Sequence, residues 1–278
     1  MKDEHVWEAL GKARIVVRDG KVEEVGEPQL KYCPIFDKFR GIKELTCDTI
    51  RENMQFRIED FGMCRADRKL RMRDYLSFGV SEMMHTAMDK GMIDAAVIVC
   101  EGCGTVVIDE PDMVQGIGGR VSGLVSTTPI PGLIKRIGAE KVLDPATAKI
   151  DQVAGTEKAI AMGYKNIAVS TASASDAKKL KALEKAHKGV NIYVFIVHTS
   201  GMSRQDAEAV YDNADIATGC ASKNIREVGK EKEAYYIGES VPIFGITERG
   251  RRFIEERIKA IGKKAERKPG AKQPDRLI

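Results

Sequence analysis

The sequence predicts an α/β fold, with a mainly parallel sheet in a three-layer sandwich and a smaller N-terminal α+β subdomain. From residue 75 onward, amphipathic helical segments alternate with short β-branched runs, and the connections between them are short. The first 74 residues differ, because they open on two β-rich runs and continue through a charged stretch that contains two prolines. We therefore divide the chain into an N-terminal subdomain (1–74), an α/β domain (75–262) and a disordered basic tail (263–278).

The N-terminal subdomain is expected to begin with a β-hairpin over residues 14–25. Its two runs are joined at Asp19-Gly20, and both residues of this pair tolerate the positive φ angles of a type I′ turn. A helix is expected around 49–61.

The α/β domain is expected to begin with a helix over 75–90, which Gly91 ends and a buried strand over 93–99 follows. The same passage from helix to strand recurs three times. The last pair runs from a strand to a helix. The expected ranges of these four pairs are 152–162 and 166–169, 175–187 and 191–197, 203–211 and 214–217, and 235–246 and 247–259.

Composition restricts the class of protein. Hydrophobic residues make up 43% and charged residues 31% of the chain, which is typical of a folded globule. The first residues do not resemble a secretory signal, and no apolar run is long enough to span a membrane. We therefore expect a cytoplasmic protein without a membrane partner. In that reducing compartment its six cysteines are expected to be free, metal-bound or catalytic.

The net charge of +4 comes from the tail. Residues 263–278 carry six Lys and Arg against two acidic residues, so the rest of the chain is balanced. Such a segment predicts a solvated end. No other basic segment or nucleic-acid-binding motif supports a nucleic-acid contact, so nucleic acid is not expected as a partner.

Cys100 and Cys103 form a Cys-x-x-Cys pair directly after a predicted strand. Ligands of open α/β sheets bind beyond the carboxyl ends of the strands, where this pair lies. Two thiols at this spacing can chelate zinc or iron, or form a reversible disulfide. The alternative is that both thiols only pack in the core.

Three further cysteines are candidate ligands. Cys220 follows another predicted strand and precedes a helix, whose N-terminus favours the thiolate. Cys33 is followed by proline, and Cys64 lies in a turn-like segment. Tight packing in turns is the alternative for each of them. Cys47, in a segment that leads into a helix, is not included.

A glycine-rich segment, residues 115–123, is the candidate cofactor site. Its backbone N–H groups could approach an anionic ligand such as a phosphate. The spacing departs from the dinucleotide fingerprint, and a flexible connector is the alternative. The candidate cofactor-binding residues are Gly116, Gly118, Gly119, Arg120 and Ser122.

His198 is the histidine with a functional position in the predicted fold. It ends the strand over 191–197, from which a sheet can present a proton-transfer group or a ligand. A histidine that only caps the turn is the alternative.

Several segments together resemble the archaeal methanogenesis marker protein eight family. They include Lys-Tyr-Cys-Pro at 31–34, Asp-Phe-Gly-Met-Cys at 60–64 and Gln-Gly-Ile-Gly-Gly-Arg at 115–120, and the resemblance extends over nearly the whole chain. Residues 78–131 are also distantly similar to the β-subunits of deazaflavin-reducing hydrogenases, which contain flavin and iron–sulfur clusters. The dense cysteine run and the Gly-x-Pro-Cys motif of those subunits are absent.

The first resemblance implies a link to methanogenesis and not a mechanism. Together with the cysteines, it leads us to expect an accessory protein of methanogenesis that binds a metal or an iron–sulfur cluster. Methyl-coenzyme M reductase or its activation factors would be the partner, and the protein would serve the maturation or activation of that enzyme. The expected ligands of the iron–sulfur cluster or zinc are Cys33, Cys64, Cys100, Cys103 and Cys220. One alternative is an oxidoreductase that holds flavin or deazaflavin near 116–123, and another is a non-enzymatic assembly scaffold.

Overall fold

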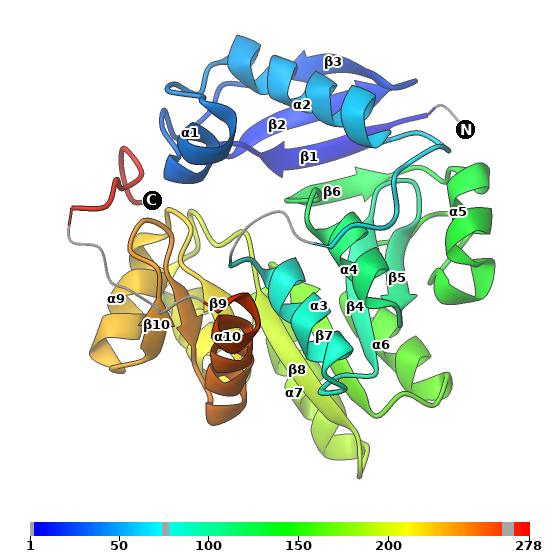
Figure 1. The fold of residues 1–278 in the computed structure, drawn as a ribbon, viewed down its shortest axis with the longest axis vertical. Coiled ribbons are helices and arrows are strands. Elements are labelled where there is room, and N and C mark those ends of the chain that lie inside the picture. The colour runs from blue at the N-terminus through cyan, green and yellow to red at the C-terminus, as the bar shows by residue number, and fades with distance from the viewer. Residues whose placement is uncertain (1–2, 74–77, 263–269) are drawn as a thin grey trace.

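The structure is a computed structural model that describes residues 3–73, 78–262 and 270–278, and it contains two β-sheets (Figure 1). A four-stranded sheet carries two helices in the N-terminal part, and a seven-stranded sheet with helices on both faces forms the larger part. The predicted α/β class is therefore confirmed.

The four-stranded sheet is antiparallel and has the order β3-β2-β1-β6. Asp19 and Gly20, with φ angles of 47° and 70°, form the turn between β2 and β3, which confirms the predicted hairpin. The fourth strand, residues 124–127, comes from the region predicted as the α/β domain, so residues before 75 do not complete this sheet. The strands are β1 (His5–Ala9), β2 (Ala13–Arg18), β3 (Lys21–Val25) and β6 (Leu124–Thr127).

Two helices, α1 (Pro34–Arg40) and α2 (Cys47–Phe61), belong to the N-terminal part. In α2, the Thr46 side chain accepts a hydrogen bond from the Thr49 amide, and the Thr49 hydroxyl oxygen accepts one from the Thr46 amide. This capping box fixes the start of the predicted helix. The short helix α1 was not predicted from the sequence. The apolar face of α2 packs on the sheet around the buried Trp7.

The seven-stranded sheet is mixed, which corrects the prediction of a mainly parallel sheet. Its centre, β4-β7-β8-β9, is parallel, but antiparallel pairings flank it on both sides. The segment predicted as one strand over 235–246 is a hairpin of two short strands. In the order of the sheet, the strands are β10 (Tyr235–Ile237), β11 (Ile243–Gly245), β9 (Ile216–Thr218), β8 (Asn191–Ile196), β7 (Asn166–Thr171), β4 (Ala95–Cys100) and β5 (Gly104–Ile108).

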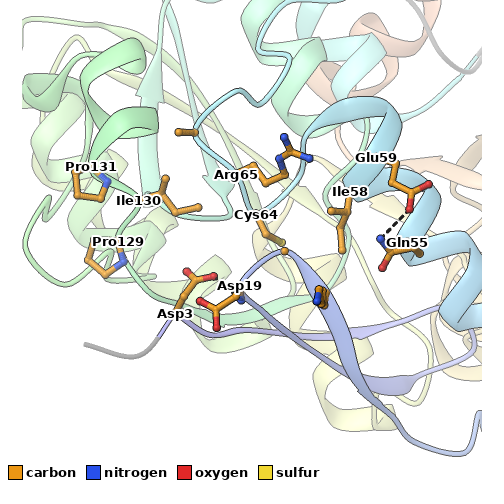
Figure 2. A pocket seen from close by; sticks show the side chains of 13 residues that line it. Asp3, Asp19, Gln55, Ile58, Glu59, Cys64, Arg65, Pro129, Ile130 and Pro131 are labelled. Carbon is orange, nitrogen blue, oxygen red and sulfur yellow. Dashed lines mark hydrogen bonds between the residues drawn. The ribbon is translucent and has the colours of Figure 1, made fainter.

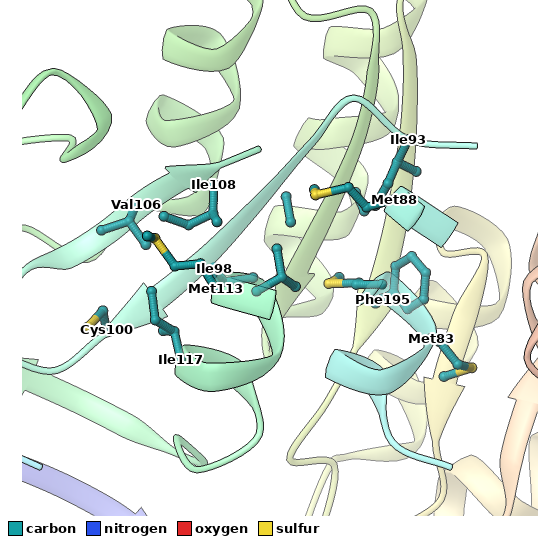
Figure 3. Packing of buried hydrophobic residues seen from close by; sticks show 14 of the residues in the cluster. Met83, Met88, Ile93, Ile98, Cys100, Val106, Ile108, Met113, Ile117 and Phe195 are labelled. Carbon is teal, nitrogen blue, oxygen red and sulfur yellow. The ribbon is translucent and has the colours of Figure 1, made fainter. Parts of the chain in front are cut away.

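Helices cover both faces of this sheet, and each face has its own buried core (Figure 1). One face carries α3 (Val80–Asp89), α4 (Pro111–Gly118) and α10 (Glu248–Ile261). The other carries α6 (Gln152–Ala161), α7 (Ala174–Ala186), α8 (Arg204–Asn213) and α9 (Lys223–Glu231). The short α5 (Pro131–Ile137) and the 3₁₀ helix η1 (Ala139–Lys141) follow β6. Figure 3 shows the first core, with Cys100 and Ile117 among its residues.

Two expectations concern segments with undescribed residues. The helix predicted over 75–90 is α3, and residues 74–77 lie outside the described chain. Of the predicted tail, residues 263–269 also lie outside it, whereas residues 270–278 contact both parts of the protein rather than extending into solvent. Within the described ranges, none of the helices has the length and apolar character that a membrane span requires.

Candidate functional site

All six cysteines are free thiols, and the five candidate ligands lie in two separate places. Cys64, Cys100 and Cys103 surround a buried Arg68–Glu101 ion pair near the end of β4. Cys33 and Cys220 lie near each other beside the loops that follow β8 and β9. Cys47 lies at the start of α2 with its thiol 3.3 Å from Glu27 Oε1, apart from both groups.

The Cys100–Cys103 pair lies in the tight connection between β4 and β5. Cys100 and Gly104 are opposite each other in the ladder, and the Cys103 amide donates to the Cys100 carbonyl at 3.1 Å. Both thiols are fully buried. Hydrogen bonding to Cys103, burial and the nearby Glu101 carboxylate raise the pKa of Cys100 well above that of an ordinary thiol. At neutral pH, Cys100 is therefore protonated.

Glycines at 102 and 104 allow this connection to fit. Both have positive φ angles, 78° and 71°. A Cβ atom at Gly104 would lie 2.1 Å from the Ala148 carbonyl oxygen, and one at Gly102 would lie 2.6 Å from Ile130 Cδ1. The Ala148 backbone and the Ile130 side chain therefore lie close against this connection, where only glycine leaves enough room.

The ion pair beside the thiols is fully buried. Arg68 Nε donates to Glu101 Oε1 at 2.6 Å, and both side chains are inaccessible to solvent. Burial alone would lower the pKa of Arg68, but Glu101 and the nearby Cys100 and Cys64 thiols raise it above its ordinary value. In a buried ion pair, the attraction between the charges compensates for part of the hydration that each has lost. Removal of either residue would therefore leave the other charge buried without a partner.

Cys64 lies in the wall of a surface pocket and, like Cys100, near the Arg68 guanidinium. It has a φ angle of 60°, which is unusual for a residue other than glycine, and it is only 4% exposed. Burial and Glu101 raise the pKa of its thiol. The pocket has a volume of about 590 Å³. Figure 2 shows Cys64 in its wall, between Ile58 on one side and Asp3 and Asp19 on the other.

A line of polar contacts runs from this pocket to the Cys-x-x-Cys connection. Asp3 Oδ1 lies 3.0 Å from His5 Nε2, and His5 Nδ1 lies 2.5 Å from Thr127 Oγ1. Thr127 Oγ1 in turn accepts a hydrogen bond of 2.7 Å from the Gly102 amide. Burial lowers the pKa of His5 despite the nearby carboxylates of Asp3 and Glu101, so His5 is neutral at pH 7.

The glycine-rich segment is not a loop. Gly116 and Gly118 belong to α4, and the Gly119 amide donates to the Gln115 carbonyl. A Cβ atom at 116 would lie 2.0 Å from the Leu70 carbonyl oxygen, and one at 118 would lie 3.0 Å from Ser81 Cβ. The first two glycines therefore permit close packing of the helix.

The other candidate cofactor residues follow this helix. Arg120 lies over the Phe61 ring, 3.8 Å from its centroid, and donates to the Met72 sulfur. Ser122 lies in the connection to β6. Flavin binding at these residues remains a prediction, but the open glycine loop on which it was based is replaced by helix.

His198 lies at the end of β8 as predicted and has a φ angle of 56°. Its Nε2 atom is 3.2 Å from Glu8 Oε1, which also contacts Lys12. Burial lowers the pKa of His198 although Glu8 acts against it. His198 thus links the sheet end to β1.

The predicted iron–sulfur or zinc site requires ligands that converge. Among the described residues, no group of three or more His, Cys, Asp or Glu side chains is placed to hold a metal ion. The five candidate cysteines do not form a single set around one position, because they are divided as described above. A cluster with three or four thiolate ligands does not fit this arrangement.

Sequence reasoning did not identify several residues of the site: Asp3, His5, Arg68 and Thr127. Each is far from Cys100 in the sequence and belongs to no motif. An arginine in a turn and a histidine in a strand can have many surface roles. Only the contacts of Arg68 with Glu101 and of His5 with Thr127 identify these residues as parts of the site. The one local signal was Glu101 itself, a charged residue inside the Cys-x-x-Cys pair.

Comparisons with known proteins agree on an archaeal family. Residues 5–259 match the family described as "Uncharacterized protein conserved in archaea (DUF2099)". An uncharacterized protein of Methanocaldococcus jannaschii is 44% identical over 264 residues, which covers 94% of this chain and 92% of that protein. No solved structure shows a significant match. The chain belongs to this conserved archaeal family, whose matched region includes both sheets and the thiol pair.

Proposed function

We propose that this protein is a thiol-dependent accessory protein in which Cys100 and Cys103 cycle between a dithiol and a disulfide. The observation that carries the proposal is the pair itself, two buried thiols in mutual contact beside the Arg68–Glu101 ion pair. A Cys-x-x-Cys pair is a common arrangement for reversible disulfide chemistry. The proposal uses no metal, because the described ligands do not converge.

The reaction is an exchange with a disulfide of a partner. Oxidation forms one Sγ–Sγ bond between Cys100 and Cys103 and releases two protons and two electrons. The partner disulfide takes up the two electrons and two protons and becomes two thiols. Cys64, in the wall of the pocket, is the thiol through which a partner would reach the buried pair.

Burial affects the rate of this exchange. The thiolate is the attacking species, and the raised pKa values of Cys64 and Cys100 keep both protonated at neutral pH. Exchange is therefore slow at pH 7 and accelerates as the pH rises. A buried pair with these properties suits a specific partner better than small disulfides in solution.

The partner that we propose is a protein of methanogenesis, methyl-coenzyme M reductase or one of its activation factors. This part rests on the resemblance to methanogenesis marker protein eight. Membership of an archaeal family is compatible with it. A role in the maturation or activation of that enzyme would use the dithiol as a reductant.

The test is a redox titration of the full chain under anaerobic conditions. The protein is equilibrated with mixtures of reduced and oxidised dithiothreitol, quenched with acid, alkylated and analysed by mass spectrometry. We expect a reversible disulfide between Cys100 and Cys103, which Cys103→Ser abolishes. Cys47→Ser, at a cysteine apart from the site, serves as the matched control and leaves the titration unchanged.

Two results would contradict the proposal. In the first, the native chain keeps both thiols reduced at every ratio, whereas the urea-unfolded chain forms the disulfide. In the second, the purified protein contains one equivalent of iron or zinc that Cys100→Ser removes, which would favour the metal-binding function instead.

A further inference from the structure

The loops that follow β8 and β9 form a second site, apart from the thiol pair. The carboxyl ends of parallel strands are where open α/β sheets bind ligands. Here the two loops cover residues 197–203 and 219–222, and the second leads into α9. His198, Gly201 and Cys220 all have positive φ angles, so the main chain of both loops turns sharply at this edge.

A main-chain group of the chain itself occupies this site. The Ile278 main-chain oxygen accepts hydrogen bonds from the Gly201 amide at 3.2 Å and from the Lys223 amide at 3.0 Å. The Ile278 amide donates to the Ala221 carbonyl at 2.8 Å. Two amides that converge on one oxygen at the start of a nine-residue helix form an arrangement that binds an acceptor oxygen of a peptide main chain.

The segment 270–278 reaches this site across the N-terminal part. Lys272 Nζ lies 2.7 Å from Asp37 Oδ2, and Asp275 Oδ1 accepts a hydrogen bond of 3.0 Å from the Tyr32 amide. Arg276 Nε donates to the Gln29 carbonyl at 2.9 Å. Figure 1 shows the end of the chain beside α1 and above α9. Specific contacts therefore hold the segment at several points along its length.

Cys33 and Cys220 lie beside this segment. Cys33 is the residue before α1, and Cys220 belongs to the loop after β9. Burial raises the pKa of Cys33, the Phe36 and Ile35 amides lower it, and Cys220 and Asp275 raise it further. Asp275 also accepts a hydrogen bond from the amide of the residue before Cys33, and the Ile278 amide donates to the carbonyl of the residue after Cys220, so the segment runs beside both thiols.

We propose that the loops after β8 and β9 are a binding site for the main chain of a peptide segment, which residues 270–278 occupy in the same chain. The segment covers Cys33 and Cys220 while it is bound, and its release opens both the site and the two thiols. Neither statement depends on the chemistry proposed for Cys100 and Cys103.

One substitution removes a single contact of this site. Lys223 is the first residue of α9, a position that favours proline, and Ser222 has the extended backbone (φ −79°, ψ 116°) that suits a residue before proline. Lys223→Pro therefore deletes the amide that binds Ile278 and leaves the helix intact. Lys223→Ala is the matched control, because it removes the side chain and keeps the amide.

The measurement is hydrogen exchange of the full chain, followed by mass spectrometry of the peptide that contains 270–278. In the wild type, we expect slower exchange than in a synthetic peptide of the same residues. Lys223→Pro should accelerate it by about fivefold, the effect of one main-chain hydrogen bond, and Lys223→Ala should leave it unchanged. Unchanged exchange in α9 shows that the variant is folded.

Alkylation rates of the cysteines complete the experiment. Iodoacetamide should modify Cys33 and Cys220 faster in Lys223→Pro than in the wild type, whereas Cys47 reacts equally in both. Exchange of 270–278 at the rate of the free peptide in the wild type, or equal effects of the two substitutions, would overturn the binding site. Faster exchange without faster alkylation would overturn the covering of the thiols.

Discussion

At the level of single residues, the site near β4 depends on buried polar groups with few partners. Glu101 Oε1 contacts Arg68, but Oε2 has no hydrogen-bond partner among the described residues. A buried carboxylate oxygen without a partner is costly, because it loses its hydration and gains nothing in return. Such groups are retained more often for function than for stability, which agrees with the placement of the thiol pair beside Glu101.

His5 should make stability depend on pH below its unfolded pKa of about 6.5. Because burial lowers its pKa, the folded chain binds this proton less readily than the unfolded chain does. The contribution of His5 to stability is therefore complete above the unfolded pKa of about 6.5 and is lost as the pH falls toward the folded pKa. We expect His5→Gln to reduce the loss of unfolding free energy between pH 7.5 and 5.5, measured by urea denaturation.

His198 provides the comparison for this prediction. Burial also lowers its pKa, so His198→Gln should remove a separate share of the same pH dependence. The two shares should add in the double variant, because the residues contact different carboxylates, Asp3 and Glu8. A His5→Gln variant with the full pH dependence of the wild type would show that His5 is not held neutral by burial.

At the level of elements, α4 shows how glycine can serve packing. Gly116→Ala should destabilise the protein by about 3 kcal/mol, because its Cβ atom meets the Leu70 backbone and neither side can yield easily. Gly118→Ala should cost about 1 kcal/mol, since its Cβ atom meets Ser81 Cβ at 3.0 Å and a small shift of the helix relieves that contact. Urea denaturation of both variants measures the difference.

Whether Gly116→Ala destabilises or stabilises the protein distinguishes a closely packed helix from an exposed one. In an exposed helix, replacing glycine by alanine would stabilise the protein by about 1 kcal/mol. A stabilised Gly116→Ala variant would therefore contradict the close approach of α4 to Leu70.

The same elements show what the sequence could reveal. Helices such as α6 and α7 were predicted within a few residues, because caps at Asp151 and Ser173 and the apolar spacing are local signals. The parallel centre also follows from the helix-to-strand alternation. The antiparallel edges and the placement of β6 do not, since strand partners depend on contacts between distant segments.

The candidate site was predictable only in part, for the same reason. The Cys100–Cys103 pair and its place after a strand could be read from adjacent residues. The sequence could not show whether all five cysteines converge. In the structure, Cys33 and Cys220 lie apart from the other three. The glycines at 116 and 118 suggested a loop. In the structure their small size permits close packing of the helix, and their conformational freedom is not used.

At the level of the whole molecule, the N-terminal part and the larger sheet depend on each other. β6 is inserted between elements of the α/β part in the sequence and pairs with β1 in the N-terminal sheet. Thr127, in that strand, contacts both His5 and the Gly102 amide. Residues 270–278 add further contacts between the two parts. Separation would expose the edge of β1 and orphan these polar groups.

We therefore expect the two parts to unfold in one transition. Trp7 is the single tryptophan of the chain and is buried under α2, so its fluorescence reports on the N-terminal part alone. Circular dichroism at 222 nm is dominated by the helices, most of which belong to the larger part. In a urea titration, the two signals should have the same midpoint, because coupled units lose their structure together.

Thr127→Val serves as the perturbation: it removes the hydroxyl between His5 and Gly102 and should lower both midpoints equally. A Trp7 transition at lower urea than the circular dichroism transition would instead identify an N-terminal domain that unfolds independently.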